Sequence, residues 1–341
     1  MKKAFLAIMA CALFVAACDD KKNQSSEATE SGSTMVAAPA FSGDSAYAFI
    51  EQQLAFGPRV PNTPAHVRGG DYIAAKLKAY GCEVTEQPFT AKAWDGTIIK
   101  GRNIIGSINP AAAKRILFSS HWDSRPRADN DSLAANHTKP VAAANDGASG
   151  VAVLLEMART IQQAKTKPTV GIDLVFFDAE DWGDGDEVTG DREAASGDFD
   201  YIGFCLGSRH WAKNPHKPGY TAYYGVLLDM VGAKGATFMK EGYSMQYAPS
   251  VVQTVWNTAS QLGFGQYFVD ANGGAITDDH MAPNLIAKIP MIDIIHTSQV
   301  GGFFPDWHTT EDDMRNIDRG TLKAVGQTLI QVAYNEQPNA A

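Results

Sequence analysis

The sequence predicts an α/β fold, a single domain in which a mixed, mostly parallel central β-sheet is flanked by helices. Two observations lead to this fold class. First, three apolar runs typical of buried strands each end on side chains that bind metals: Ile116–Phe118 before His121 and Asp123, Leu174–Phe177 before Asp178, Glu180 and Asp181, and Val226–Leu228 before Asp229. Second, a helical pattern lies between the first two runs, as in the strand–helix–strand units of parallel sheets. Because the carboxyl ends of parallel strands share one edge, we expect these polar side chains to meet in one crevice.

The remaining elements follow from periodicity and turn residues. Residues 67–80 carry apolar side chains at helical spacing, and Gly81 stands where a helix C-terminus favours glycine. The helix between the first two runs is expected over 148–163, with one apolar face formed by Val151, Leu154, Leu155, Ala158 and Ile161. The other expected elements are strands at 82–89, 102–108, 170–177 and 291–295, and helices at 250–262 and 321–334.

The first residues predict export. Met1-Lys2-Lys3 is a basic start, and the apolar stretch over 4–17 is about 14 residues long, enough for a signal-peptide core but short of the ~20 needed to span a bilayer. Val15-Ala16-Ala17-Cys18 resembles the lipobox of bacterial lipoproteins, in which the cysteine is lipidated. We therefore expect a lipoprotein signal peptide at 1–17 and a membrane anchor at Cys18. An ordinary secretory signal with an incidental cysteine is the alternative.

Composition sets the domain boundaries. Residues 18–44 are mostly small and polar, which predicts a flexible tether. We expect one catalytic domain over 45–336 and a short tail over 337–341, because the intervening chain has ample apolar residues and no repeat. With 38 acidic and 29 basic residues, nucleic acid is not an expected partner. Cys82 and Cys205 are expected to be free buried thiols, although an exported protein allows them to pair.

The acidic residues after the second apolar run are the strongest chemical signal. Asp178, Glu180 and Asp181 are packed into four residues at the end of a buried strand. Such crowding raises the proton affinity of carboxylates unless a cation compensates, and a bound metal is the simplest cation. One acid would then bind the metal while its neighbour transfers protons. The alternative is a solvated acidic loop.

Other candidates have a structural explanation beside the functional one. Asp146, in Asn145-Asp146-Gly147, would cap the helix that follows and is also able to bind a metal. Asp278 begins Asp278-Asp279-His280, which is either a metal-binding triplet or a polar turn. His308 follows Trp307, whose indole would form a wall of a pocket.

Taken together, these motifs resemble those of the zinc aminopeptidase superfamily over nearly the whole expected domain. The motifs, in chain order, are His121-Trp122-Asp123, Asn145-Asp146-Gly147-Ala148-Ser149-Gly150, Phe177-Asp178-Ala179-Glu180-Asp181, Leu228-Asp229-Met230-Val231-Gly232 and Trp307-His308-Thr309. Three features resemble the glutaminyl-peptide cyclotransferases of animal type and their bacterial relatives: Asp278-Asp279-His280-Met281-Ala282-Pro283, the insertion between Glu180-Asp181 and Leu206-Gly207-Ser208, and Trp307 directly before His308. The resemblance implies a zinc-aminopeptidase-like fold of the phosphorylase/hydrolase type.

The resemblance also implies roles for individual residues. Asp146, Asp181 and His308 would bind one catalytic Zn²⁺, and Glu180 would be the general acid/base. Asp229 and Asp278 would form a carboxylate network beside Glu180, and Trp307 would line the substrate pocket. His121, oriented by Asp123, would be a leftover ligand of a second metal site. The family's metal-binding acid is commonly glutamate, so Asp181 departs from the pattern by one methylene.

The implied activity is conversion of the N-terminal glutamine of peptides and proteins to pyroglutamate with release of ammonia. The main alternative is an aminopeptidase with two zinc ions, in which His121 and Asp229 would complete the second site. A binding module without activity is a third and more distant interpretation. We expect a monomer at the periplasmic side or cell surface of a bacterium, attached to the membrane through Cys18.

Overall fold

The computed structural model describes residues 35–185, 203–297 and 302–337. Its centre is a six-stranded sheet with the order β1-β2-β4-β3-β5-β8. Its strands are β1 Glu83–Lys92, β2 Ile98–Ile108, β3 Arg115–His121, β4 Gly171–Phe177, β5 Gly225–Asp229 and β8 Met291–Ile295. The pairings β1–β2 and β2–β4 are antiparallel, and β3–β4, β3–β5 and β5–β8 are parallel. The expected mixed, mostly parallel sheet is therefore confirmed.

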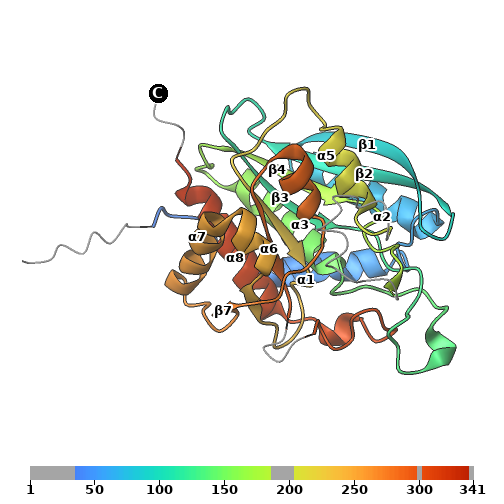
Figure 1. The fold of residues 1–341 in the computed structure, drawn as a ribbon. Helices are drawn as coiled ribbons and strands as arrows, with labels where there is room; N and C mark the ends of the chain where they lie inside the picture. Colours follow the sequence, from blue (N-terminus) through green and yellow to red (C-terminus); the bar gives the residue numbers. More distant parts are fainter. Residues whose placement is uncertain (1–34, 186–202, 298–301, 338–341) are drawn as a thin grey trace, which may run out of the picture. The chain divides into compact units, whose positions relative to one another are not determined.

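Helices cover both faces of this sheet (Figure 1). The α-helices are α1 Gly43–Leu54, α2 Pro64–Ala79, α3 Ala148–Gln163, α5 Leu206–Lys213, α6 Gly242–Tyr247, α7 Pro249–Gln261 and α8 Arg319–Asn335. Shorter pieces are the 3₁₀ turns Ala134–Asn136 and Met314–Asn316, the π turn Pro283–Ala287, and the two-stranded sheet of β6 Phe238–Lys240 and β7 Phe268–Asn272. The sheet therefore separates two layers of the core, one on each face.

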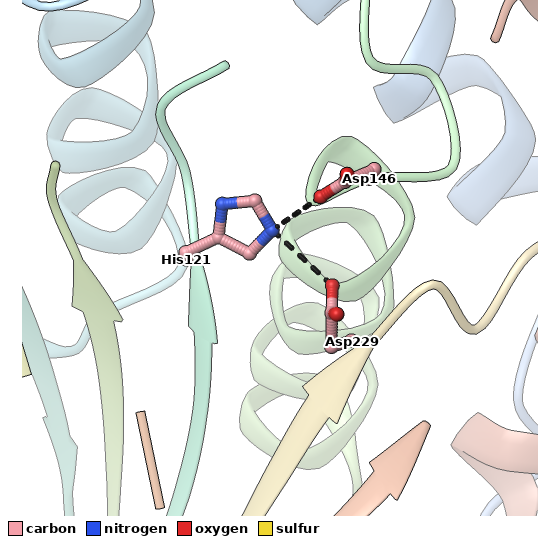
Figure 2. A group of neighbouring side chains, drawn as sticks. All are labelled: His121, Asp146 and Asp229. Atoms are coloured by element: carbon pink, nitrogen blue, oxygen red, sulfur yellow. Dashed lines mark hydrogen bonds and ion pairs between the residues drawn. The ribbon is translucent and has the colours of Figure 1, made fainter. Parts of the chain in front are cut away.

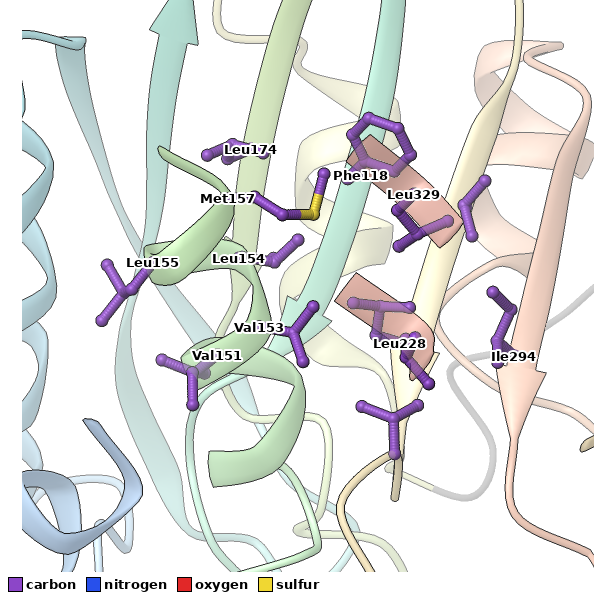
Figure 3. Packing of buried hydrophobic residues seen from close by; sticks show 14 of the residues in the cluster. Phe118, Val151, Val153, Leu154, Leu155, Met157, Leu174, Leu228, Ile294 and Leu329 are labelled. Atoms are coloured by element: carbon purple, nitrogen blue, oxygen red, sulfur yellow. The ribbon is translucent and has the colours of Figure 1, made fainter. Parts of the chain in front are cut away.

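The larger layer of the core lies between the sheet and α1, α3 and α8. Leu154 and Met157 of α3 pack with Phe118 of β3 and Leu228 of β5 (Figure 3). On the opposite face, Trp211 of α5 belongs to a second cluster that includes the alternating residues of the same strands, such as Leu117, Val175 and Leu227. A parallel sheet buried on both faces explains why its strands read as continuous apolar runs.

Several elements have the bounds expected from sequence. The helix over 148–163 and the strand over 291–295 are found as α3 and β8. The first two strands are longer than expected, because β1 and β2 pair from Glu83↔Ser107 to Lys92↔Ile98. The outer part of this hairpin has mostly exposed side chains, so its sequence lacks the apolar signal of the buried strands.

The predicted tether is too long at its C-terminal end. The compact domain begins at Met35 rather than at residue 45. Ser42 caps α1 by accepting a hydrogen bond from the Ser45 amide, and Phe41 is 3% exposed. The Phe41 ring packs on Gly326 of α8, where only a residue without a Cβ allows this approach. The residues around Phe41 are mostly small, so the sequence does not indicate that this side chain is buried.

None of the helices in the described residues is long and apolar enough to cross a bilayer. The expected signal peptide, Cys18 and most of the insertion after Asp181 lie outside the described residues. Cys82 and Cys205 are both free and buried, as expected.

Candidate active site

The polar ends of β3, β4 and β5 meet at one edge of the sheet, as expected from sequence. From β3 the chain moves through α3 to the neighbouring β4, and then returns past β3 to β5 on the other side. The strand order therefore reverses at β3, and in open α/β sheets ligands bind at such a reversal. Among the described residues, three groups of possible metal ligands have their ligand atoms within 4.8 Å of one another. The first two share Asp146 and are His121, Asp146 and Asp229, and Asp146, Asp181 and His308; the third is Glu180, Cys205 and Asp278.

The first group is centred on His121 at the end of β3 (Figure 2). Its Nε2 lies 2.9 Å from Asp146 Oδ1 and 3.2 Å from Asp229 Oδ1, and all three residues are buried. Burial alone would lower the pKa of His121. The neighbouring carboxylates of Asp123, Asp146 and Asp229 outweigh burial and raise this pKa well above 6.5. The positive charge of a protonated His121 would oppose a cation at this position.

The second group contains the three zinc ligands implied by the resemblance. His308 Nε2 lies 3.0 Å from Asp181 Oδ1 and 3.6 Å from Asp146 Oδ2. Asp181 Oδ2 is buried and has no hydrogen-bond partner. An imidazole, two carboxylates and an unpartnered carboxylate oxygen suit Zn²⁺, which binds such ligands in a catalytic site and keeps a further position for substrate. The residues present therefore fit the ion.

Asp123 lies beside His121, as expected, and makes a second set of contacts. Its Oδ1 lies 3.6 Å from His121 Nδ1, at ion-pair distance but without a hydrogen bond. Asp123 also accepts hydrogen bonds from the backbone amides of Glu180 and Asp181, at 3.0 and 3.2 Å. Asp123 thus holds the turn that presents the two acids.

Asp178 does not belong to the metal site. Its carboxylate accepts hydrogen bonds from His66 Nε2, at 2.8 and 2.9 Å, and from the Arg102 amide at 2.6 Å. His66 also stacks on Trp122, with ring centroids 4.3 Å apart. The sequence predicts three crowded carboxylates at this strand end. In the structure, Asp178 pairs with His66, and only Glu180 and Asp181 face the crevice.

Glu180 is placed as a proton carrier. Burial raises its pKa well above 4.5, and the charges of Asp181 and Asp278 add to this effect, while His121 opposes it. Cys205 Sγ lies 3.5 Å from Glu180 Oε1, as a hydrogen-bond donor. No motif indicates this contact, because Cys205 lies at the end of the insertion, 25 residues from Glu180 in the chain. A carboxyl group with a raised pKa is suited to general acid/base catalysis near neutral pH.

A network of buried acids lies beside Glu180. Burial, with Asp146 and Asp181 adding their charge, raises the pKa of Asp229 to about 6. Burial and the charge of Asp229 raise the pKa of Asp278 to about 7. Burial and the charge of Asp278 raise the pKa of Asp279 to about 8. The protein thus concentrates negative charge where a divalent cation would offset it.

A pocket opens above these groups, and its apolar walls are formed by Phe204, Ile276, Ile295, Phe303 and Trp307. Glu180, Asp181, Asp278 and His308 also line it. Trp307 stacks on His308 with ring centroids 3.8 Å apart, so one wall of the pocket is fixed to a candidate zinc ligand. A pocket of this kind, apolar with a few convergent polar groups, is typical of a small-molecule or side-chain binding site.

Backbone strain marks the same region. Among the described residues, four other than glycine have positive φ angles and lie at or next to residues of the site: Ala179, Cys205, Met230 and His308. Such angles cost of order 1–3 kcal/mol each and persist where the surrounding structure holds them for function. No sequence pattern predicts these angles, because alanine, cysteine and methionine rarely adopt them.

Comparisons with known proteins agree with this geometry. Residues 103–333 match the model of peptidase family M28. A bovine protein named glutaminyl-peptide cyclotransferase is 27% identical over 257 residues, which cover 67% of this chain and 64% of the bovine one. The chain therefore spans somewhat less than two thirds of that relative.

Two solved structures are more similar. One is a glutaminyl cyclase of Bacteroides thetaiotaomicron bound to N-acetylhistamine, with 49% identity and a TM-score of 0.82, covering 88% of this chain and 100% of that one. Another is named a Zn-dependent exopeptidase from Parabacteroides distasonis, with 51% identity, a TM-score of 0.82 and the same coverage. The protein belongs to peptidase family M28, and within it the chain is similar to glutaminyl cyclases.

Proposed function

We propose that the protein is a zinc-dependent glutaminyl-peptide cyclotransferase. It would convert the N-terminal glutamine of peptides and proteins to pyroglutamate and release ammonia. The observation that carries the proposal is the position of Glu180, whose carboxyl has a raised pKa and which lines the same pocket as Asp146, Asp181 and His308. The bovine relative and the Bacteroides neighbour are named for this activity.

The reaction needs no water molecule as nucleophile. The α-amine of the substrate attacks its own γ-amide carbon, a C–N bond closes the ring, and the original amide C–N bond breaks to release ammonia. Zn²⁺ held by Asp146, Asp181 and His308 would supply electrostatic stabilisation of the negative charge that develops on the carbonyl oxygen.

Proton transfer is the task of Glu180. Its carboxylate would accept a proton from the attacking α-amine and donate it to the departing nitrogen, so the group returns to its starting state. Burial keeps the pKa of Glu180 raised, and the charges of Asp181 and Asp278 add to this effect, so the group can both accept and donate the proton.

Substrate orientation is the task of the pocket. A glutamine side chain is flexible, and ring closure requires it to fold back on the α-amine. Trp307 and the apolar residues around it would hold the folded side chain against the zinc site and exclude water. Fixing the reacting atoms in this way can supply several kcal/mol, of order 7–11 in the best intramolecular cases.

A product assay separates this function from the two-zinc aminopeptidase, for which His121 and Asp229 remain available as ligands. Zinc-loaded protein is given Gln-β-naphthylamide, and ammonia and free naphthylamine are measured together. A cyclase releases ammonia and leaves the naphthylamide bond intact. Free naphthylamine as the main product, with leucine naphthylamide also cleaved, would establish the aminopeptidase instead.

The proposal extends to location and partners. A cleaved signal peptide over 1–17 and lipidation of Cys18 would export the protein and anchor it to a membrane, facing the periplasm or the cell surface. The tether would then run from Cys18 to the start of the compact domain at Met35. We further propose that it acts as a monomer with one zinc ion. Metabolic labelling with a palmitate analogue tests the anchor, since Cys18→Ser should abolish the label.

A further inference from the structure

Arg125 is a fully buried cation directly behind the second ligand group. It is 0% exposed and follows the β3 terminus by four residues. Its Nη1 donates to the backbone carbonyl of Asp181 at 3.0 Å and to Asp181 Oδ1 at 3.1 Å. One nitrogen of the guanidinium thus holds both the main chain and the side chain of a candidate zinc ligand.

The other side of the guanidinium holds Asp129. Nε of Arg125 donates to Asp129 Oδ1 at 2.7 Å, and Nη2 donates to Asp129 Oδ2 at 2.5 Å, which is the two-pronged geometry that only arginine offers. This geometry holds the Arg125 guanidinium and the Asp129 carboxylate in a fixed orientation relative to each other.

Asp129 connects this pair to the second ligand. Its Oδ1 lies 3.8 Å from His308 Nδ1, on the opposite side of the ring from the Nε2 that faces Asp181. The next residue, Asn130, donates its amide to the His308 carbonyl at 3.1 Å. The segment that carries Asp129 thus contacts both the ring and the backbone of His308.

We propose that Arg125 and Asp129 form one positioning unit for the zinc ligands Asp181 and His308 and set the affinity of the site for Zn²⁺. The inference rests on the zinc site of the proposed function, not on the reaction. Arg125 occupies Asp181 Oδ1 and leaves Oδ2, which is buried without a partner, to a cation. Asp129 directs Nδ1 of His308 away from the site, so that Nε2 points into it.

The charges of the unit are consistent with this role. Arg125 and Asp129 carry opposite charges that cancel, so the negative charge of the ligand Asp181 remains available to a cation. Partners that orient metal ligands in this way typically change metal affinity 10- to 100-fold when they are removed.

The test measures zinc affinity directly. Metal-free protein is titrated with Zn²⁺ in competition with a chromophoric chelator, for the parent, Arg125→Met and Arg125→Lys. The unit predicts a roughly 10- to 100-fold weaker Kd for Arg125→Met, because Asp181 and Asp129 lose their shared donor. Arg125→Lys should recover part of the loss, since an ammonium keeps the charge but has no planar fork. An unchanged Kd in folded Arg125→Met overturns the proposal.

A matched control is available on β3, the strand that precedes Arg125. Arg115, at the other end of β3, is 7% exposed and makes a two-pronged pair with Asp173, at 2.6 and 2.7 Å. Arg115→Met should lower thermal stability and leave the zinc Kd at the parent value. If Arg115→Met weakens zinc binding as much as Arg125→Met, a general loosening of the fold explains both, and the proposal fails.

A second variant decides the matter if Arg125→Met does not fold. Asp129→Asn keeps the size of the side chain and leaves Arg125 with Asp181, but removes the charge beside His308. A weaker zinc Kd in folded Asp129→Asn supports the unit, and a Kd equal to that of the parent overturns it. Because the readout is zinc affinity, loss of the proposed cyclase activity in the parent protein would leave this result unaffected.

Discussion

Asp146 belongs to both ligand groups that contain a histidine, and each of its two oxygens faces one of them. Its Oδ1 lies near His121 and its Oδ2 near His308. Its position is fixed by Asp312, which accepts hydrogen bonds from the amides of Asn145 and Asp146 at 2.8 and 3.1 Å. A carboxylate held in this way could bind one metal ion or two. The number of available ligands therefore does not separate a cyclase from an aminopeptidase, whereas the reaction product and the number of bound zinc ions do.

Glu180→Gln tests the division of labour between the two adjacent acids. The amide cannot carry a proton, so kcat should fall about 10²- to 10⁴-fold. Asp181 remains, so zinc content, measured by atomic absorption after dialysis, should stay at the parent level. Glu51→Gln, on the exposed side of α1, is the control and should change neither quantity. Loss of zinc from Glu180→Gln would mean that Glu180 is the ligand and Asp181 the proton carrier.

At the scale of single residues, the sequence predicts the polar side chains that follow the strands, but not the residues whose hydrogen bonds hold them in place. His121, Glu180, Asp181 and Asp229 were identifiable because each follows an apolar run. Asp278 and Trp307 were candidates from the sequence, but the role of Asp278 beside Glu180 was indicated only by resemblance. Arg125, Asp129, Cys205 and Asp312 were missed, since their partners are distant in the chain or are backbone groups, and no spacing records such contacts.

At the scale of elements, α3 determines how the site is assembled. It starts directly after Asp146 and Gly147, and its first turn packs on the ends of β3 and β5. A Cβ placed on Gly150 would lie 2.7 Å from the Leu228 carbonyl and even closer to Ser120 Oγ. The approach of helix to sheet therefore requires glycine at this position.

Gly150→Ala should separate α3 from the sheet and destabilise the fold by about 1–3 kcal/mol, the usual cost of overpacking a core. Urea unfolding followed by circular dichroism measures this change. Gly265→Ala is the control, because Gly265 is exposed and a Cβ there would meet no atom within 4 Å. Equal midpoints for Gly150→Ala and the parent would show that α3 can shift without cost.

The start of the domain is a second feature that the sequence does not predict. Phe41 precedes α1 and is buried against α8, so Phe41→Ala should cost about 3–5 kcal/mol, as for other buried aromatic rings. Met35→Ala, at an exposed position, should have little effect. Urea midpoints compare the two variants. If Phe41→Ala is as stable as Met35→Ala, the tether extends to residue 44 as the composition indicated.

Elements with strong periodicity were predictable and those with weak periodicity were not. α3 and β8 are almost entirely buried, and their bounds were correct. The missed α1, α5 and α6 are short or contain many small and polar residues, and β6 and β7 form a separate two-stranded sheet. Tertiary contacts determine such segments more than their own sequence does.

At the scale of the whole molecule, the buried acids should make stability depend on zinc and pH. Asp278 and Asp279 have pKa values of about 7 and about 8, above the ~3.9 of an unfolded chain. The folded, zinc-free protein therefore binds more protons than the unfolded one, and stability is lost as pH rises through these values. His216 and His296, with pKa values of about 4, act in the opposite direction only below about pH 6.5.

Thermal unfolding at pH 6.5 and pH 8, with zinc or with chelator, measures this dependence. The melting temperature of chelated protein should fall between the two pH values, and zinc should raise it more at pH 8, because the cation replaces the missing protons. The Asp278→Asn variant should show a smaller pH effect. A chelated protein with the same melting temperature at both pH values would contradict the raised pKa values of these acids.

The most direct test of the central claim is a zinc titration of metal-free protein with a peptide that begins with glutamine, followed by mass spectrometry of the peptide. One zinc ion at Asp146, Asp181 and His308 predicts that activity rises to a plateau at one equivalent, and that the peptide loses the mass of one ammonia without becoming shorter. A plateau reached only at two equivalents, with a peptide shortened by its first residue, would contradict the account.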